Sequence, residues 1–364
     1  MTEKQKTYYV IGLMSGSSLD GVDLAYCKIQ SGGQWKYKIL HAKTYPYNEG
    51  DKDFLKKLRK RPVKEAKTHD DLFGFSYAVL INRFRKEFNI RKLDFIASHG
   101  HTTHHHPEKK ITLQLGSGKQ IAKLNFHPAV TNFRVADIKA GGQGAPLVPV
   151  CDAYFFSQYD ACLNIGGIAN ISYMMRGERI GFDICPANQL LDNLAQKLNK
   201  PFDKNGAIAK KGKINNKLMV ALEKKRYFSL DPPKSLDNTF VEKNFMKTIN
   251  EARCSVADKM RTVVERIAIE IAGAIIRDAS FNQSKLAKYK LLVTGGGAYN
   301  KFLLQRIEKL ARINIQLPDD ETIQYKEALA MCLMGVLRWE NKPNFLPSVT
   351  GAKKAVSGGE IFNP

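Results

Sequence analysis

The stretch YYVIGLMSGSSLDGVDLAYCKI, residues 8–29, decides the fold class of this chain. An apolar run ends at Met14, and from Val22 onward apolar residues alternate with other residues in the way that suits a pleated strand. Asp20 and Gly21, which separate the two runs, form a pair typical of a tight turn between strands. Residues 7–29 therefore predict a strand, a turn rich in serine, glycine and aspartate, and a second strand.

The turn has the composition of a site for a metal-bound phosphate. Glycine lets the backbone approach a ligand closely, and consecutive N–H groups form a concave seat for an anion. Ser15, Ser17 and Ser18 add hydroxyl donors, whereas Asp20 and Asp23 would repel a bare phosphate and so require a cation. Magnesium is often held by one or two carboxylates together with substrate phosphates. The residues alone are equally consistent with an ordinary polar hairpin turn with a capping aspartate.

The same organisation returns later in the chain, which indicates an internally duplicated architecture. ACLNIGGIANISYMM (161–175) has an apolar run, a turn at Gly166 and Gly167, and a second apolar run, and ERIGFDICP (178–186) supplies the next strand. YKLLVTGGGAYN (289–300) is a buried strand that runs into a glycine turn. Such a turn accepts nucleotide adenosine or phosphates at close range, although glycine triplets also serve as plain tight turns.

Strands alternate with helices along the chain, as in an α/β protein. Residues 53–90 are expected to be mostly helical, apolar residues recur at helical spacing through 260–275, and 325–339 is apolar nearly all round. A length of 364 residues suggests about two domains. Because a glycine-dense stretch begins near residue 133, we expect one lobe from residues 1–132 plus 340–364 and a second from 133–339.

Composition narrows the choice of partners and compartment. The net charge of +22 invites a nucleic-acid hypothesis, but the lysines are spread along the chain and no nucleic-acid-binding motif accompanies them, so we expect no nucleic-acid partner. No apolar run approaches the roughly 20 residues of a membrane span, and the first residues lack the features of a secretory signal. The six cysteines show no metal-ligand spacing. These features favour a reducing cytoplasm and no membrane association.

Two further stretches hold candidate chemistry. Asp183 stands where a strand ends, and a partly desolvated carboxylate there would suit a general base, although an aspartate in this position is often only a loop cap. SHGHTTHHHP (98–107) contains five of the eight histidines. No cysteine or carboxylate stands at ligand spacing beside them, so we expect a polar lip on a cleft rather than a metal site.

Taken together, these stretches resemble the anhydro-N-acetylmuramic acid kinase family, and the likeness spans nearly the whole chain. Ser17 stands where the family usually has threonine, and His101 where its His-Gly-Gln-Thr element has glutamine. The motifs that carry the resemblance, in chain order, are IGLMSGSSLDGVD (11–23), SHGHTTHHHP (98–107), NFRVADIKAGGQGAPLVP (132–149), LNIGGIANIS (163–172), DPPKS (231–235), TGGGAYN (294–300), KEALA (326–330) and LPSVTGA (346–352).

The resemblance implies two ribonuclease-H-like lobes of the actin-like ATPase and sugar kinase superfamily around an ATP cleft. The implied reaction uses ATP and water to convert 1,6-anhydro-N-acetylmuramic acid into its 6-phosphate, with Asp183 as the base that activates water. It also implies ATP and Mg²⁺, with the metal held through water by Asp20 and Asp23, and a cytoplasmic homodimer. The implied phosphate and nucleotide residues are Gly16, Ser17, Ser18, Leu19, Asp20, Gly21, Val22, Asp23, Gly166, Gly167, Gly295, Gly296 and Gly297, and the implied sugar residues are His99, Thr102, Arg134 and Glu327.

The chain departs from the family pattern on the sugar side. The family's Asp-Thr-Gly-Pro-Gly-Asn is here Asp-Ile-Cys-Pro-Ala-Asn at 183–188, and its Ser-Thr-Gly-Arg-Glu is Ser-Leu-Asp-Asn-Thr at 235–239. Two alternatives therefore stay open beside the recycling kinase: a divergent kinase for another anhydro- or amino sugar, and a non-catalytic nucleotide-binding regulatory protein. Retention of Asp183 speaks against the second alternative.

Overall fold

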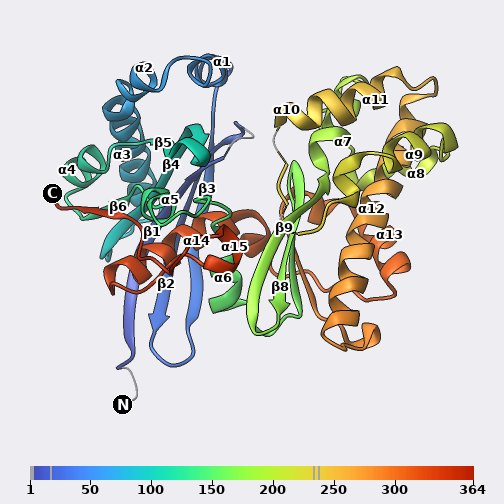
Figure 1. The fold of residues 1–364 in the computed structure, drawn as a ribbon. Coiled ribbons are helices and arrows are strands. Elements are labelled where there is room, and N and C mark those ends of the chain that lie inside the picture. Colours follow the sequence, from blue (N-terminus) through green and yellow to red (C-terminus); the bar gives the residue numbers. More distant parts are fainter. Residues whose placement is uncertain (1–3, 17–18, 233, 237) are drawn as a thin grey trace. The chain divides into compact units, whose positions relative to one another are not determined.

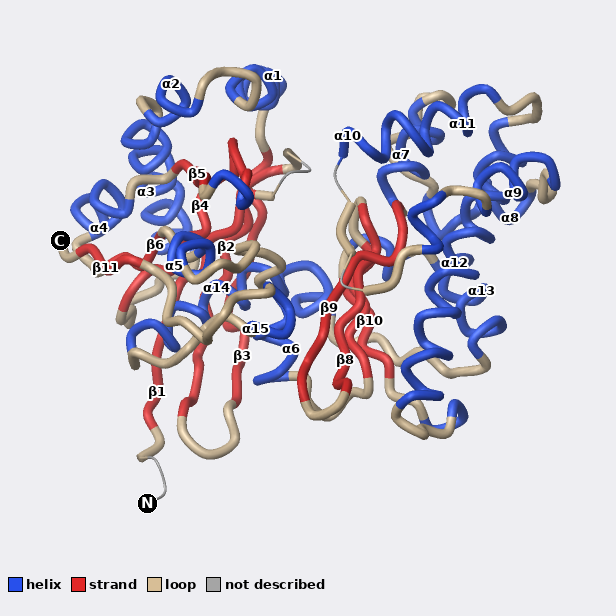
Figure 2. The backbone as a smooth tube through the Cα atoms, viewed as in Figure 1, coloured by secondary structure: helices blue, strands red, loops and turns tan. Residues whose placement is uncertain are grey.

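The computed structural model describes residues 4–16, 19–232, 234–236 and 238–364. The chain forms two compact units, the first made of Met1–Phe155 and Tyr325–Pro364 and the second of Phe156–Gln324 (Figure 1). The second unit is thus inserted into the sequence of the first. Each unit consists of a β-sheet and the helices that cover it (Figure 2).

The first unit is built on a mixed sheet. In the described residues this sheet has seven strands in the order β11-β6-β4-β1-β2-β3, with β5 paired to β4. Strands β1, β2 and β3 form an antiparallel meander, and β4 runs parallel to β1. The elements of this unit are β1 (Lys6–Ser15), β2 (Gly21–Ser31), β3 (Lys36–Pro46), α1 (Glu49–Leu58), α2 (Val63–Lys67), α3 (Asp70–Glu87), β4 (Phe95–His106), β5 (Ile111–Leu115), α4 (Gly118–Asn125), β6 (Ala129–Thr131), α5 (Arg134–Lys139), α6 (Val148–Phe155), α15 (Pro347–Thr350) and β11 (Glu360–Phe362).

The second unit has a smaller sheet, whose described strands follow the order β10-β7-β8-β9. Strands β7, β8 and β9 again form an antiparallel meander, and β10 runs parallel to β7. Its elements are β7 (Ala161–Ile165), β8 (Ile168–Met175), β9 (Glu178–Pro186), α7 (Asn188–Gln196), α8 (Ala207–Lys211), α9 (Asn216–Glu223), α10 (Asn238–Val241), α11 (Lys247–Glu251), α12 (Val256–Phe281), β10 (Leu291–Thr294) and α13 (Lys301–Ala311), and α14 (Asp320–Trp339) crosses from this unit into the first.

Both units therefore repeat one design: a three-stranded meander whose first strand pairs on its other side with a parallel fourth strand. This repeat confirms the internal duplication and the α/β class that the sequence predicts. The two glycine-containing hairpins occupy equivalent places, because β1–β2 opens the first meander and β7–β8 opens the second.

Helices cover both faces of the first sheet (Figure 2). Alternate residues of β1 and β2, such as Ile11 and Leu24, belong to a buried apolar cluster with residues of α1, α3 and α4. On the opposite face, α14 approaches β1 so closely that a Cβ on Gly12 would lie 2.1 Å from the carbonyl oxygen of Ala328. Glycine at position 12 is what allows this contact, which places α14 against the sheet.

The core of the second unit is formed around α12. Val263, Ile267 and Ile271 recur at helical spacing and lie in one buried cluster with residues of β7, β8 and β9 and of α7 and α13. The amphipathic helix predicted through residues 260–275 is thus confirmed and extends at both ends to Val256 and Phe281.

The compact units differ from the domain boundaries expected from the sequence, since residues 133–155 and 325–339 belong to the first unit rather than the second. The physical reason is packing. The rings of Tyr154 and Phe155 on α6 contact those of Trp35 and Tyr37, with centroids 4.9 and 4.8 Å apart respectively. A buried ion pair, 2.6 Å from Lys326 Nζ to Asp152 Oδ1, joins α14 to α6 inside the same unit.

Candidate active site

The turn between β1 and β2 is short and fixed at its base. Ser15 pairs with Val22 in the ladder, and Val22 is fully buried. Leu19 adopts a left-handed backbone (φ 62°), and its side chain is buried in the apolar cluster of the first unit. A Cβ on Gly21 would lie 2.4 Å from the carbonyl oxygen of Tyr45, so this glycine serves the packing of β2 on β3. Ser17 and Ser18, which are predicted phosphate contacts, lie outside the described residues.

The two predicted metal ligands are a pair of carboxylates at this hairpin. Asp20 is exposed, whereas Asp23 is half-buried and accepts a hydrogen bond of 2.6 Å from Thr44 Oγ1. Burial raises the pKa of Asp23, the bond from Thr44 lowers it, and the charge of Asp20 raises it again. A cation would relieve this repulsion, and carboxylate oxygens are ligands that Mg²⁺ prefers. Among the described residues no group of three or more histidine, cysteine or acidic side chains gathers for a metal, so water and phosphate oxygens would complete the shell.

Ser15 differs from the prediction that its hydroxyl serves the ligand. Its side chain is buried, and Oγ lies 2.8 Å from Nδ1 of His101 and 2.8 Å from the hydroxyl of Tyr47. His101 is buried, Tyr47 is partly buried, and both bond the hydroxyl of Ser15, so the prediction that Ser15 adds a hydroxyl donor for the ligand is wrong. Ser15 is the last residue of β1, and its side chain lies on the same face of the strand as Ile11 and Leu13, toward the core. The sequence alone predicts it in the turn instead.

Three of the predicted sugar residues, Arg134, His99 and Glu327, are neighbours in the first unit. Arg134 Nε donates to Nε2 of His99 (3.0 Å), and its Nη1 donates to the carbonyl oxygen of Gly144 (2.6 Å). Burial lowers the pKa of Arg134 to about 10 and holds that of His99 well below its usual value. His99 is therefore neutral, and the nitrogen facing Arg134 is an acceptor because arginine only donates.

Glu327 stands among charges of both signs. Burial raises the pKa of its carboxyl, the nearby carboxylate of Asp23 raises it further, and the cations of Arg134 and Lys326 lower it. The hairpin carboxylate and the predicted sugar residues are thus electrostatic neighbours within one unit. A desolvated carboxyl group can accept hydrogen bonds from sugar hydroxyls, and a guanidinium beside it can pair with a carboxylate of the same substrate.

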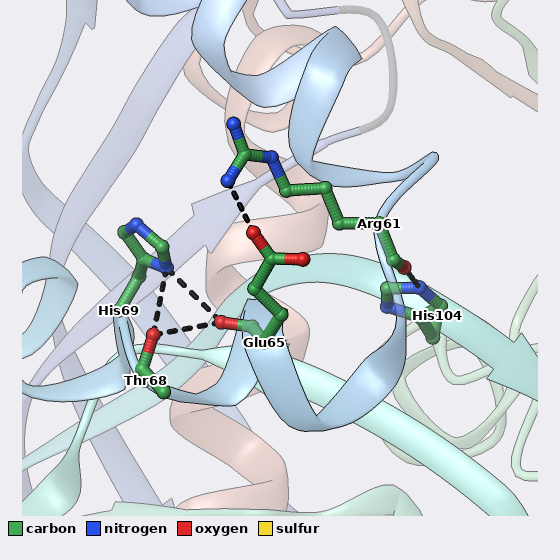
Figure 3. Close-up of polar contacts among 5 residues, drawn as sticks. All are labelled: Arg61, Glu65, Thr68, His69 and His104. Atoms are coloured by element: carbon green, nitrogen blue, oxygen red, sulfur yellow. Dashed lines mark hydrogen bonds and ion pairs between the residues drawn. The ribbon is translucent and has the colours of Figure 1, made fainter.

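Side chains at the histidine-rich end of β4 take part in hydrogen bonds of the first unit. His104 Nε2 donates to the carbonyl oxygen of Arg61 at the corner between α1 and α2 (2.8 Å), where Arg61 also pairs with Glu65 (Figure 3). His105 Nδ1 lies 3.0 Å from Thr112 Oγ1 across the β4–β5 ladder. Thr102 accepts a bond of 3.3 Å from Gln114 Nε2 on the same ladder. Each of these side chains has a separate partner.

In the second unit, a β-bulge aims Asp183. Asn170 pairs with Asp183 and Ala169 with Cys185, so Ile184 is an extra residue on β9. Such a bulge bends a strand and redirects its side chains. Ile184 is buried, whereas the side chain of Asp183 is only partly buried and its Oδ2 accepts a hydrogen bond of 2.8 Å from the backbone N–H of Leu236.

Desolvation makes Asp183 a stronger base than an exposed aspartate. Burial raises the pKa of its carboxyl to about 6, although the bond from Leu236 lowers it. The segment that carries Leu236 also fixes the backbone, since Asp183 N donates to the carbonyl oxygen of Lys234 and Tyr227 Oη donates to the carbonyl oxygen of Asp183. A carboxylate with a pKa near 6 is ionised at neutral pH and still accepts a proton readily.

The residues after Asp183 that depart from the family pattern are interior ones. Ile184, Cys185 and Ala187 are each 2 % exposed or less. Burial raises the pKa of the Cys185 thiol to about 12, so this cysteine is a packing residue and not a nucleophile. The altered loop therefore changes the packing behind the base.

The five predicted glycines of the second unit fall into two groups. A Cβ on Gly297 would lie 2.2 Å from Ile165 Cγ2, and Gly295 has a left-handed backbone (φ 80°), so the local structure requires both. A Cβ on Gly166, Gly167 or Gly296 would meet nothing closer than 3.5 Å. Packing does not explain these three glycines, and they expose backbone where a ligand could approach closely. The neighbouring helix α7 holds the turn, because Asn188 N donates to the carbonyl oxygen of Gly166.

Sequence reasoning missed the residues that support the site rather than form it. Thr44 bonds Asp23, and its place was available from the hairpin pattern, since the two residues face each other on β2 and β3. Tyr227 and Leu236 hold Asp183 from an irregular segment, and no pattern in the sequence places that segment beside β9.

Comparison with known proteins identifies the family of this chain. The sequence model described as "Anhydro-N-acetylmuramic acid kinase" matches residues 8–364. Proteins of that name from Francisella tularensis subsp. novicida (strain U112) and Clostridioides difficile (strain 630) are 34% and 35% identical, and each alignment covers 97% of this chain and 98% of the relative. A more distant likeness is the (R)-2-hydroxyglutaryl-CoA dehydratase component A of Acidaminococcus fermentans, with 13% identity, a TM-score of 0.41 and coverage of 90% and 96% of the two chains.

Proposed function

The chain belongs to the anhydro-N-acetylmuramic acid kinase family, and we propose from the geometry which of its residues perform the reaction. It is a kinase that uses ATP to phosphorylate an amino sugar of the bacterial cell wall during recycling, with an alcohol group as acceptor. In the proposed sequence, water attacks the anomeric carbon of 1,6-anhydro-N-acetylmuramic acid and the bond from that carbon to O6 breaks. The released O6 then attacks the γ-phosphorus, and ADP leaves.

Asp183 takes the proton of the attacking water, and its environment is the observation that carries the proposal. The carboxylate is partly desolvated, held by the N–H of Leu236, and has its pKa raised to about 6. A base of this strength is ionised at neutral pH, and general-base assistance contributes roughly 10²- to 10⁴-fold in rate.

Arg134, His99, Thr102 and Glu327 bind the sugar. Arg134 is fixed by uncharged acceptors on His99 and Gly144, which orients the guanidinium without neutralising it. A guanidinium held in this way is suited to pair with the lactyl carboxylate of the substrate. The desolvated carboxyl of Glu327 then accepts from a sugar hydroxyl or amide.

The hairpin of residues 16–23 holds the phosphates, and Gly166, Gly167 and Gly296 hold the nucleotide by backbone approach. The free space beside these three glycines supports this role, whereas Gly295 and Gly297 serve the local fold. Asp20 and Asp23 hold Mg²⁺ through water, and the metal when bound neutralises charge on the transferred phosphoryl group.

A coupled ADP-release assay tests the proposal. We expect turnover with 1,6-anhydro-N-acetylmuramic acid, its loss in Asp183→Asn, and its retention in Asp278→Asn. The control is matched, because burial also raises the pKa of Asp278 to about 6 in the same unit, but this carboxylate bonds Tyr289 and Asn282. Turnover only with another sugar would assign a different substrate, and nucleotide binding without any turnover would reject the catalytic assignment.

We also propose a cytoplasmic homodimer, by analogy with the family. Among the described residues no helix is both long and apolar enough to cross a membrane. Light scattering of the purified protein should give twice the chain mass of 40.9 kDa, and a mass equal to one chain would reject the dimer.

A further inference from the structure

We propose that His101 is a positioning residue for phosphate binding: through hydrogen bonds it fixes Ser15, the residue from which the β1–β2 turn departs. The proposal rests on the assignment of that turn to the phosphates of the nucleotide. It gives a role to a histidine that contacts neither carboxylate of the hairpin and none of the predicted sugar residues by a hydrogen bond in the described structure.

A bulge in β4 places His101 beneath Ser15. In the parallel ladder Leu13 pairs with Ser98 and Ser15 with His101, so β4 advances three residues where β1 advances two. Gly100 takes up the extra length with a left-handed backbone (φ 71°), and a Cβ there would lie 2.4 Å from the carbonyl oxygen of Leu115. Only glycine fits this conformation and this contact, and the bulge therefore sets the position of the histidine ring.

The donor and acceptor nitrogens of His101 follow from its partner Arg59. Arg59 Nη2 lies 3.2 Å from Nε2 of His101, and because arginine can only donate, Nε2 is the acceptor. The ring proton is then on Nδ1, which donates to Ser15 Oγ at 2.8 Å. Ser15 Oγ also lies 2.8 Å from Tyr47 Oη, and Tyr77 Oη lies 3.4 Å from Tyr47 Oη. The hydroxyl of Ser15 is thus held by two side-chain hydrogen bonds.

Burial strengthens the case that these bonds fix Ser15. His101 is fully buried and Ser15 is 1 % exposed, so breaking the network leaves polar groups without water to replace it. Burial lowers the pKa of His101 to about 3, and the ring is neutral at physiological pH, as the donor and acceptor pattern requires. Fixing Ser15, where the turn begins, reduces the backbone freedom that phosphate binding would otherwise have to remove.

Two substitutions on β4, one at His104 and one at His101, provide controls. His104 stands on the same strand and bonds the carbonyl oxygen of Arg61, so it anchors the same α1–α2 corner without bonding Ser15 (Figure 3). Glutamine has a carbonyl acceptor and an amide NH2 group, so it can supply both the acceptor and the donor of a neutral histidine. The proposal therefore distinguishes His101→Gln, which keeps both bonds, from His101→Leu, which loses both.

The experiment measures binding of Mg·ADP alone by isothermal titration calorimetry, with the Michaelis constants for ATP and sugar as a second readout. We expect His101→Leu and Ser15→Ala to weaken ADP binding about tenfold, as a lost buried hydrogen bond does, and to leave the sugar Michaelis constant unchanged. The double variant should be no weaker than either single one, because both break the same link. His101→Gln should bind within about twofold of the original protein, and His104→Leu should lower only the melting temperature.

Several outcomes would overturn the proposal: unchanged ADP affinity in Ser15→Ala, equal weakening in His101→Gln and His101→Leu, additive losses in the double variant, or a matching loss with His104→Leu. The conservative Ser15→Ala and His101→Gln variants keep the test available if His101→Leu does not fold. Since ADP binding is measured without sugar, failure of sugar turnover would reject the proposed reaction and leave this comparison intact.

Discussion

Replacing the proposed base with its neutral amide should make the protein more stable at neutral pH while abolishing turnover. The pKa of Asp183 rises from 3.8 to about 6 on folding, so the folded chain holds this proton more tightly than the unfolded chain. The associated stability is complete below pH 3.8 and is lost as pH rises through about 6. At 1.36 kcal/mol per pH unit the loss is about 3 kcal/mol, and partial exposure of the carboxylate reduces the expected gain in Asp183→Asn to about 1–3 kcal/mol.

Calorimetric melting of the ligand-free protein between pH 4 and pH 8 measures this effect. An asparagine keeps the acceptor for the N–H of Leu236, so no hydrogen bond is lost with the charge. The melting transition of the second unit should rise by about 2–4 °C per kcal/mol at pH 8. The gain should shrink toward zero as the pH approaches 4.

The matched variant is Asp278→Asn, whose carboxyl has a similarly raised pKa. The two carboxylate oxygens of Asp278 accept one hydrogen bond each, from Asn282 Nδ2 and from Tyr289 Oη. An asparagine side chain has only one oxygen, so one of these two bonds is lost in the variant. This variant should therefore be less stable, by about 1–3 kcal/mol. If Asp183→Asn is no more stable than the original protein at pH 8, or if its gain is the same at pH 4, Asp183 is not a desolvated carboxylate and the reasoning fails.

Three further outcomes follow from the described geometry. The value of kcat/KM should fall about tenfold per pH unit below about pH 6 as Asp183 is protonated, and an acid limb near pH 4 in the ADP-release assay would argue against a raised pKa. Gly296→Ala should weaken ADP binding several-fold and leave the melting temperature unchanged. Gly297→Ala, whose Cβ would lie 2.2 Å from Ile165 Cγ2, should instead destabilise the second unit by about 1–3 kcal/mol. Equal effects of the two variants in calorimetry would contradict this distinction. Asp152→Asn should cost the first unit about 3–5 kcal/mol because it removes the carboxylate charge that lies 2.6 Å from the buried ammonium group of Lys326, and an unchanged denaturation midpoint would refute this.

Local patterns in the sequence were enough to predict the two hairpins. Asp20-Gly21 and Gly166-Gly167 are turn residues between apolar runs, and the structure places both in β-hairpins that open equivalent meanders. The long helix α12 was predicted for the same reason, because its apolar spacing is uninterrupted. Such features depend on residues that are neighbours in the chain.

The domain boundaries and the environment of Ser15 depend on distant contacts and were not predictable. Helix α14 is apolar nearly all round, so its sequence does not say which sheet it covers, and the answer lies in its approach to Gly12. Ser15 was expected to serve the ligand, but the bulge at Gly100 brings His101 beneath it. A left-handed glycine and a one-residue shift between parallel strands leave no periodic trace in the sequence.

The division of the first unit into two sequence segments has a consequence for biosynthesis. When the ribosome has completed residue 324, the sheet of the first unit still lacks α14, because all but the first five residues of that helix follow residue 324. Until then the face around Gly12 is bare apolar surface, and the inserted unit has already emerged and is free to fold by itself. Nascent chains halted before Tyr325 should therefore bind chaperones, and chains extended beyond α14 should bind them less.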